Sequence, residues 1–158
     1  MSTSYRQFGD TGDLPRLITA LDARTLVFDV EPLVADWDGT QEALDRGVTA
    51  VLSLVAKIPC VGAVCFSTNS ARRPVVLPAV PGIEVIYMVS ARKPLSIGSY
   101  RRLPLPGVVI GDQVLTDGLL ARRLGYSFLH YRPPHAGPAG PRLLDTTGQL
   151  ARPLIFRR

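Results

Sequence analysis

The chain has few of the residues that build disulfide-bonded or zinc-bound proteins. Its 158 residues include only two cysteines, Cys60 and Cys65, and both lie in apolar sequence without the spacing of metal ligands. This pattern argues against a zinc site and favours a reducing compartment, with both cysteines packed in the core. The first residues contain no apolar run after a basic start, so we expect no secretory signal and predict a cytoplasmic protein.

Long uninterrupted hydrophobic runs are also missing. The longest apolar stretch, residues 48–66, contains Lys57, Pro59 and Gly62 near its middle. Such interruptions are typical of a helix, a loop and a buried strand, and not of a membrane span. We therefore expect no transmembrane segment.

The length suits one domain with a sizeable core. We assign residues 1–133 to that domain, and we treat residues 134–158 as a tail. The tail is rich in Pro, Gly and Arg, a composition that cannot hold long helices. We expect it either to follow the surface of the domain, with its final "PLIF" docked there, or to be partly mobile.

Lysine is scarce, because only Lys57 and Lys93 are lysines among 18 basic residues and the other 16 are arginines. The net charge of +5 favours anionic partners such as phosphate esters, acidic lipid surfaces or nucleic acid, although on charge alone a basic solvated surface is the better explanation. The arginine pairs fall mostly on predicted helices without interleaved aromatic residues. We therefore expect no nucleic-acid partner.

Short apolar runs alternate with amphipathic segments along the first 133 residues. This alternation predicts right-handed βαβ crossovers and hence an α/β fold: a three-layer α/β/α sandwich around a mostly parallel, five-stranded, Rossmann-like sheet. Neither the chain after the first of these strands nor that after the second is long enough for a large cap domain. The predicted strands are residues 25–29, 61–67, 84–89, 108–112 and 126–131, and the predicted helices are residues 41–56, 71–77, 96–103 and 114–124.

Polar residues follow the predicted strands at the points where ligands bind in a parallel sheet. Singly each has an ordinary explanation, such as a helix cap or a turn. Together they are what phosphoryl transfer from a monoester requires: a carboxylate nucleophile, carboxylates for Mg²⁺, and a lysine and hydroxyls for the phosphate oxygens. These residues are Asp29, then Ser67 with Thr68 and Asn69, then Arg92 with Lys93, then Asp112 and Asp117.

Four segments carry a resemblance to a known family. "FDVEPLVADWD", "FSTNSARR", "ARKPL" and "GDQVLTDGLLARRLGY" resemble, in order and spacing, the motifs of the haloacid dehalogenase (HAD) superfamily of aspartate-nucleophile phosphatases. Within it they are similar to a small capless HAD-IIIA type group related to phosphatidylglycerophosphate phosphatases. The resemblance covers residues 14–133, and the last two segments are its most specific part.

The resemblance implies a role for each residue. Asp29 would be the nucleophile that forms an aspartyl-phosphate, Glu31 the general acid and base, and Lys93 the partner of both nucleophile and phosphoryl group. Phosphate binding would use Ser67, Thr68, Asn69 and Lys93, and Mg²⁺ would be held by Asp29, Glu31 through its backbone carbonyl, Asp112 and Asp117. The implied substrate is a phosphate ester, such as a phospholipid head group reached at the membrane surface.

Two positions of the first motif depart from the family. Glu31 stands where the family has aspartate, and Leu33 stands where it has threonine. The extra methylene of Glu31 moves the carboxyl group by more than about 1 Å, and a misplacement of that size can cost about a hundredfold in rate. An alternative interpretation is therefore a degenerate HAD fold that serves as a binding or scaffolding subunit.

The pentapeptide "DWDGT" at residues 36–40 is a second candidate for the first motif. With Asp36 as nucleophile, Asp38 would supply the usual acid and Thr40 the usual threonine. However, the strand that ends at Asp36 would contain Pro32, which is unfavourable in a central strand. We therefore favour Asp29 and regard "DWDGT" as the loop that follows the motif.

Overall fold

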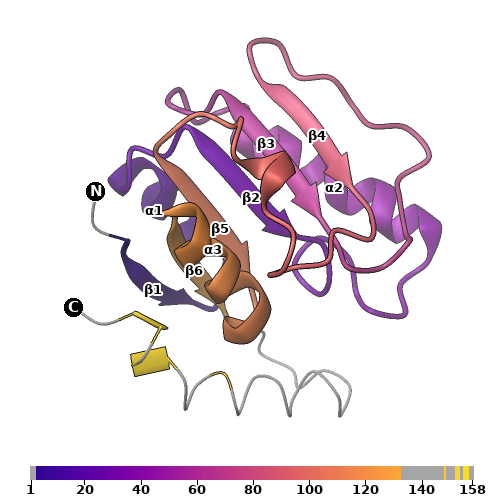
Figure 1. The fold of residues 1–158 in the computed structure, drawn as a ribbon. Helices are drawn as coiled ribbons and strands as arrows, with labels where there is room; N and C mark the ends of the chain where they lie inside the picture. Colours follow the sequence, from indigo (N-terminus) through magenta and orange to yellow (C-terminus); the bar gives the residue numbers. More distant parts are fainter. Residues whose placement is uncertain (1–2, 133–147, 149–151, 154, 157–158) are drawn as a thin grey trace.

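The computed structural model describes residues 3–132, 148, 152, 153, 155 and 156. Its centre is one six-stranded sheet in the order β1-β6-β5-β2-β3-β4 (Figure 1), and every neighbouring pair is parallel. The α/β class and the parallel sheet are thus confirmed, and the number of strands is six instead of five. The strands are β1 (Tyr5–Phe8), β2 (Thr25–Asp29), β3 (Ala63–Ser67), β4 (Glu84–Met88), β5 (Gly107–Gly111) and β6 (Ser127–Tyr131).

The unpredicted strand is β1, which extends the sheet beside β6. Its sequence, YRQF, has no apolar run, and only Phe8 is buried. An edge strand has one hydrogen-bonded neighbour and needs little hydrophobic burial of its own. The sequence signal that identifies central strands is therefore absent here.

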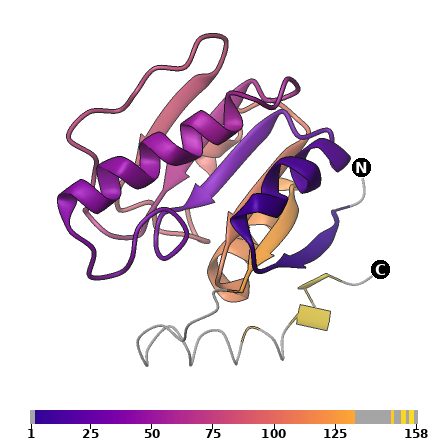
Figure 2. The ribbon, with the colours of Figure 1, turned by 180° about the vertical axis from the view of Figure 1, so that it is seen from behind.

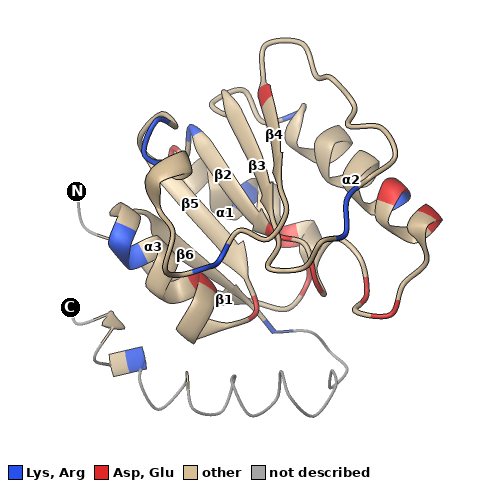
Figure 3. Cartoon of the chain, turned by 45° about the vertical axis from the view of Figure 1, so that its right-hand side comes forward, with Lys and Arg blue, Asp and Glu red and all other residues tan. Residues whose placement is uncertain are grey.

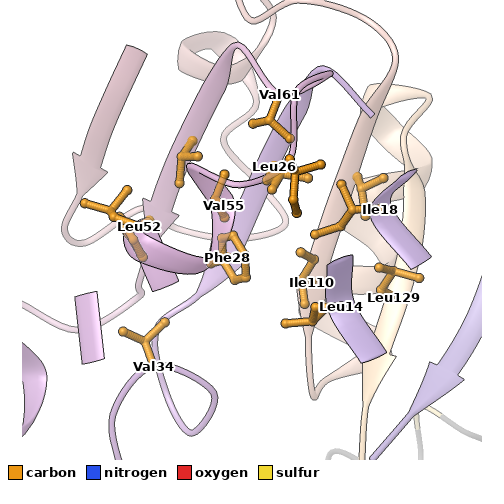
Figure 4. Packing of buried hydrophobic residues seen from close by; sticks show 14 of the residues in the cluster. Leu14, Ile18, Leu26, Phe28, Val34, Leu52, Val55, Val61, Ile110 and Leu129 are labelled. Atoms are coloured by element: carbon orange, nitrogen blue, oxygen red, sulfur yellow. The ribbon is translucent and has the colours of Figure 1, made fainter. Parts of the chain in front are cut away.

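Helices α1 (Leu14–Ala20) and α2 (Gln41–Val55) cover one face of the sheet (Figure 2). Helix α2 was predicted and α1 was not. The buried residues of α2 recur every three or four positions along its length, as expected for an amphipathic helix. They pack with Phe28 and Ile110 of the sheet in one core cluster (Figure 4), and they are Leu44, Val48, Leu52 and Val55.

The opposite face of the sheet is covered by less regular chain. It carries α3 (Leu119–Leu124), a π-helical turn, η3 (Val114–Gly118), and a short 3₁₀ helix, η2 (Gly98–Tyr100). A further 3₁₀ turn, η1 (Thr11–Asp13), precedes α1. Because so much of this cover is irregular, the regular three-layer arrangement is not confirmed.

Two predicted helices are wrong. Residues 71–77 contain no helix, because polar contacts hold this segment against α2. The Gln41 side chain donates to the Arg73 carbonyl at 3.0 Å, and the Val75 amide donates to Asp45 Oδ1 at 2.9 Å. Residues 96–103 form only η2, between Pro94 and Pro104.

The predicted burial of the cysteines is confirmed for Cys65, whereas Cys60 is half-buried. Of the tail, Ile155 is buried against the second face and the Phe156 ring lies 5.3 Å from the Tyr5 ring, measured between centroids. Residues 133–147, 149–151, 154, 157 and 158, and with them the proposed boundary at residue 133, lie outside the described part of the chain. Among the described residues, no helix combines the length and apolar character needed to cross a membrane.

Candidate functional site

The strand order has a switch point at β2, where the chain stops adding strands on one side of β2 and begins to add them on the other. After β2 the chain adds β3 and β4 on one side, and it then returns to add β5 and β6 on the other. Ligands of open α/β sheets bind at such a switch point, beyond the carboxyl ends of the strands. Asp29 is the last residue of β2 and pairs in register with Ser67, the last residue of β3.

A buried lysine joins two carboxylates at this point. Lys93 follows β4, and its Nζ lies 2.7 Å from Asp29 Oδ1 and 2.7 Å from Asp117 Oδ1. All three side chains are almost wholly buried. Asn69 fixes the lysine backbone, since Asn69 Oδ1 accepts from the Lys93 amide at 2.8 Å and Asn69 Nδ2 donates to the Lys93 carbonyl at 3.3 Å.

The charges of this group depend on each other. Burial raises the pKa of Asp29 well above its usual value and Asp117 raises it further, while Lys93 opposes both. Burial also lowers the pKa of Lys93, but the attraction of Asp117 and Asp29 outweighs burial and leaves that pKa above its usual value. Lys93 is therefore an ammonium ion that holds the carboxylates together, and it is no candidate for a base.

Asp117 is held by the turn between β5 and α3. It is fully buried in η3, and its Oδ2 accepts from the Gln113 amide at 3.3 Å. Gly111, at the end of β5, leaves room for it, because a Cβ at that position would overlap the Asp117 carboxylate. The close approach explains a glycine here and fixes the distance between strand β5 and the carboxylate.

Three carboxylates converge into a group that suits a divalent cation. One oxygen each of Asp29, Asp112 and Asp117 lies within 4.8 Å of the others. With Lys93 counted, the ionised group carries two negative charges, which match a dication, and oxygen ligands are those that Mg²⁺ prefers. Figure 3 shows acidic positions just beyond the end of β5 and in loops on the same side of the sheet.

Glu31 faces a different set of partners. Its carboxylate is buried and accepts from Thr68 Oγ1 at 2.8 Å and from Ser70 Oγ at 3.3 Å, and Arg72 Nη1 lies 3.5 Å from it. The Glu31 side chain is not part of the three-carboxylate group. Thr68, expected at the phosphate, instead donates to Glu31.

Ser67 has a partner that sequence reasoning missed. Its Oγ lies 2.6 Å from the Tyr100 hydroxyl, and both residues are buried. Burial raises the pKa of Tyr100 to about 12, although the hydrogen bond to Ser67 opposes this shift. No local signal marks Tyr100, because it lies on η2, in a segment that the sequence assigned to a longer helix.

The second acidic segment lies in a loop away from any strand end. Asp36, Trp37 and Asp38 are exposed. The Asp36 and Gly39 carbonyls accept from Arg72 at 2.9 and 2.8 Å, and the Thr40 hydroxyl caps α2. Of the two candidate aspartates, only Asp29 ends a strand in the described structure.

Comparisons with protein-family models, with curated proteins and with solved structures find no match to this chain.

Proposed function

We propose that the protein is a Mg²⁺-dependent phosphomonoester phosphatase of the HAD type that works through an aspartyl-phosphate. The observation that carries this proposal is the buried Lys93 ammonium ion, 2.7 Å from both Asp29 and Asp117, beside Asp112. A nucleophilic carboxylate, a cation to hold the phosphoryl oxygens and a cation-binding set of carboxylates meet at one switch point of the sheet. The motif resemblance supports the same assignment independently of this geometry.

In the proposed reaction, a carboxylate oxygen of Asp29 attacks phosphorus and the bond to the ester oxygen breaks. The leaving alkoxide takes a proton from Glu31, and a water molecule then gives its proton back to Glu31 as it attacks the phosphorus of the aspartyl-phosphate. Inorganic phosphate leaves and Asp29 is restored. Lys93 holds negative charge on the phosphoryl oxygens throughout, assisted by the Ser67 hydroxyl.

The cation would be held directly by Asp29 and Asp112, with the Glu31 carbonyl as a further oxygen ligand. When bound, it supplies charge screening between the attacking carboxylate and the phosphoryl group. Asp117 already shares one oxygen with Lys93 and the other with the Gln113 amide. We therefore assign Asp117 a supporting part at the metal site, through water.

The proposed substrate is a large or surface-bound phosphate ester, with a phospholipid head group such as phosphatidylglycerophosphate as the first choice. The links after β2 and β3 are short and leave the site without a large cap. The motif resemblance and the net charge of +5 support a substrate at an anionic membrane surface. A cytoplasmic protein with peripheral membrane contact fits this proposal.

The test is phosphate release from a small aryl phosphate and from phosphatidylglycerophosphate, with and without Mg²⁺. Asp29→Asn should lower Mg²⁺-dependent release by more than about a thousandfold, because the nucleophile is lost. Asp36→Asn is the matched control and should stay within about threefold of the native rate, since Asp36 is exposed. The opposite ranking of the two variants would move the first motif to Asp36.

A second candidate, a binding or scaffolding subunit, is favoured by the partners of Glu31. Its carboxylate contacts Thr68, Ser70 and Arg72. The acid that should protonate the leaving group is therefore already bound by other side chains. Absence of Mg²⁺-dependent release on both substrates, in a folded sample, would favour this candidate. Activity that is abolished by Glu31→Gln would instead show that these contacts orient a working acid.

A further inference from the structure

A buried histidine lies directly behind the carboxylate group. His130, on β6, is fully buried. Its Nε2 lies 2.9 Å from the backbone carbonyl oxygen of Asp112, and its Nδ1 lies 2.7 Å from the Tyr5 hydroxyl. The imidazole therefore connects edge strand β1 to the end of β5, where Asp112 begins the turn into η3.

The carbonyl neighbour fixes one proton of this connection. A carbonyl oxygen carries no hydrogen, so Nε2 must donate to Asp112. If the ring is neutral with its hydrogen on Nε2, Nδ1 accepts a hydrogen bond from the Tyr5 hydroxyl. The Tyr5 oxygen in turn accepts from Gln7 Nε2 at 2.8 Å. In this neutral form, the hydrogen bonds of Gln7, Tyr5 and His130 all run toward the Asp112 backbone carbonyl.

The surroundings keep the ring in this orientation. The His130 ring stacks on Phe128 with centroids 5.5 Å apart and an interplanar angle of 18°. It also lies at a tilt to Tyr5, with centroids 5.8 Å apart. Rotation of the imidazole would bury a donor against these rings, which costs free energy. A ring locked in this way can hold the Asp112 backbone at one position.

We infer that His130 is a positioning residue for the cation site: it fixes the Asp112 backbone, and Tyr5 on the edge strand fixes His130. The inference depends on the carboxylate group of the proposed function but not on catalysis. Partners behind metal ligands commonly change metal affinity by about 10-fold to 100-fold when they are removed. A bond to the ligand's backbone should have an effect near the lower end of that range.

The test measures Mn²⁺ binding by electron paramagnetic resonance in the full chain, without substrate. His130→Asn keeps a group near the Nδ1 position and removes the donor to Asp112, so Mn²⁺ affinity should fall about 10-fold. His130→Gln retains a donor near the Nε2 position and should stay within about threefold of the native protein. A purely structural role would give the two variants the same affinity.

Tyr5→Phe is the second variant, because it removes a single hydroxyl and keeps the ring. We expect Mn²⁺ affinity to fall about threefold, while Tyr131→Phe, on the neighbouring strand β6, leaves it unchanged. Equal affinity of native, His130→Asn and Tyr5→Phe proteins would overturn the inference. No Mn²⁺ binding by the folded native protein would overturn both the inference and the proposed function, whereas binding without phosphate release would overturn the proposed function alone.

Discussion

Two acidic segments lie seven residues apart in the chain and have opposite surroundings. Asp29 and Glu31 are buried and have cationic or hydroxyl partners, whereas Asp36 and Asp38 are exposed in a loop. Their local sequences would suggest the reverse, because "DWDGT" matches the HAD signature more closely than "DVEPL". Asp29 contacts Lys93 because it lies at the end of a buried strand, although its local sequence matches the motif less well.

The contrast also teaches how the second segment is used. Its carbonyls bind the Arg72 guanidinium, which also approaches Glu31, and its threonine caps α2. The loop therefore contributes backbone atoms and a cap to the arrangement around the first segment. Four substitutions test this division, and they follow from the largest expected effect to the smallest.

The largest effect should come from the buried ion group. Lys93→Met leaves the Asp29 and Asp117 carboxylates buried without their ammonium partner, and the free energy of unfolding should fall by about 3–5 kcal/mol. Lys57→Met changes the other lysine of the chain, which is exposed, and should change stability by less than about 0.5 kcal/mol. Urea unfolding at neutral pH measures both.

The loss in Lys93→Met should depend on pH. Burial raises the pKa of Asp29 in the native protein, and removal of Lys93 removes the contribution that opposes this rise. A carboxyl group whose pKa is higher in the folded state stabilises the fold at low pH, and this contribution is lost as pH rises through the folded-state pKa. The deficit of Lys93→Met should therefore shrink between about pH 7 and about pH 5, and a deficit that grows would contradict the assignment.

The next effect concerns Arg72, which links the two segments. Arg72→Ala removes bonds to Glu31 and to the Asp36 and Gly39 carbonyls, so stability should fall by about 2 kcal/mol. Trp37 is the single tryptophan of the chain and lies in this loop. Its fluorescence anisotropy should therefore fall as well. Arg73→Ala changes an exposed neighbour and should leave both stability and anisotropy unchanged. An unchanged anisotropy in Arg72→Ala would show that Arg72 does not link the two acidic segments.

A smaller effect should follow at Gly47, where α2 meets the chain between the two segments. A Cβ at this position would overlap the Val34 carbonyl. Alanine is more favourable than glycine in a helix by about 1 kcal/mol. Here, however, its Cβ would overlap a backbone carbonyl that cannot move away, so Gly47→Ala should lower the free energy of unfolding by about 1–2 kcal/mol. Ser53→Ala, on the exposed side of the same helix, is the control. A more stable Gly47→Ala protein would show that the loop can move away from the helix.

The smallest effect should come from Thr40 in the exposed segment. Its hydroxyl accepts from the Ala43 amide at 3.2 Å, so Thr40→Ala should cost about 1 kcal/mol of stability. Thr40→Ser retains the cap and should recover most of this loss. Mg²⁺-dependent phosphate release should stay near the native rate in both, because Thr40 is a cap and not part of the carboxylate group. A large loss of activity in Thr40→Ala would favour "DWDGT" as the first motif.

Strands with continuous apolar runs could be predicted, and features held by long-range contacts could not. The five runs such as "TLVFD" all form strands. Strands β2, β3 and β5 are buried at every residue, which demands apolar sequence, whereas β4 at the opposite edge is only partly buried but still has an apolar run. Strand β1 gave no such signal, since an edge position requires little burial. Residues 71–77 have helical spacing, but contacts with Gln41 and Asp45 hold them along α2 instead.

The sequence placed acids, hydroxyls and a lysine at strand ends, and the structure brings Asp29, Lys93, Asp112 and Asp117 together there. The direction of Glu31 was not predictable, because it depends on Thr68, Ser70 and Arg72, which reach it from the loop after β3. The hydrogen bonds of Tyr100 to Ser67 and of His130 to Asp112 were missed for the same reason. Neither has a local pattern, because what marks Tyr100 and His130 is contact with residues distant in the chain.

By itself, the sequence determined the α/β class, the parallel sheet and the residues at the carboxyl ends of its strands, because burial and chain direction follow from the order of apolar and polar residues. Only the tertiary structure decided which carboxylates share the lysine, where Glu31 points and what stands behind Ser67 and Asp112. Those choices depend on distances of a few ångströms between segments far apart in the chain, and local composition does not encode such distances.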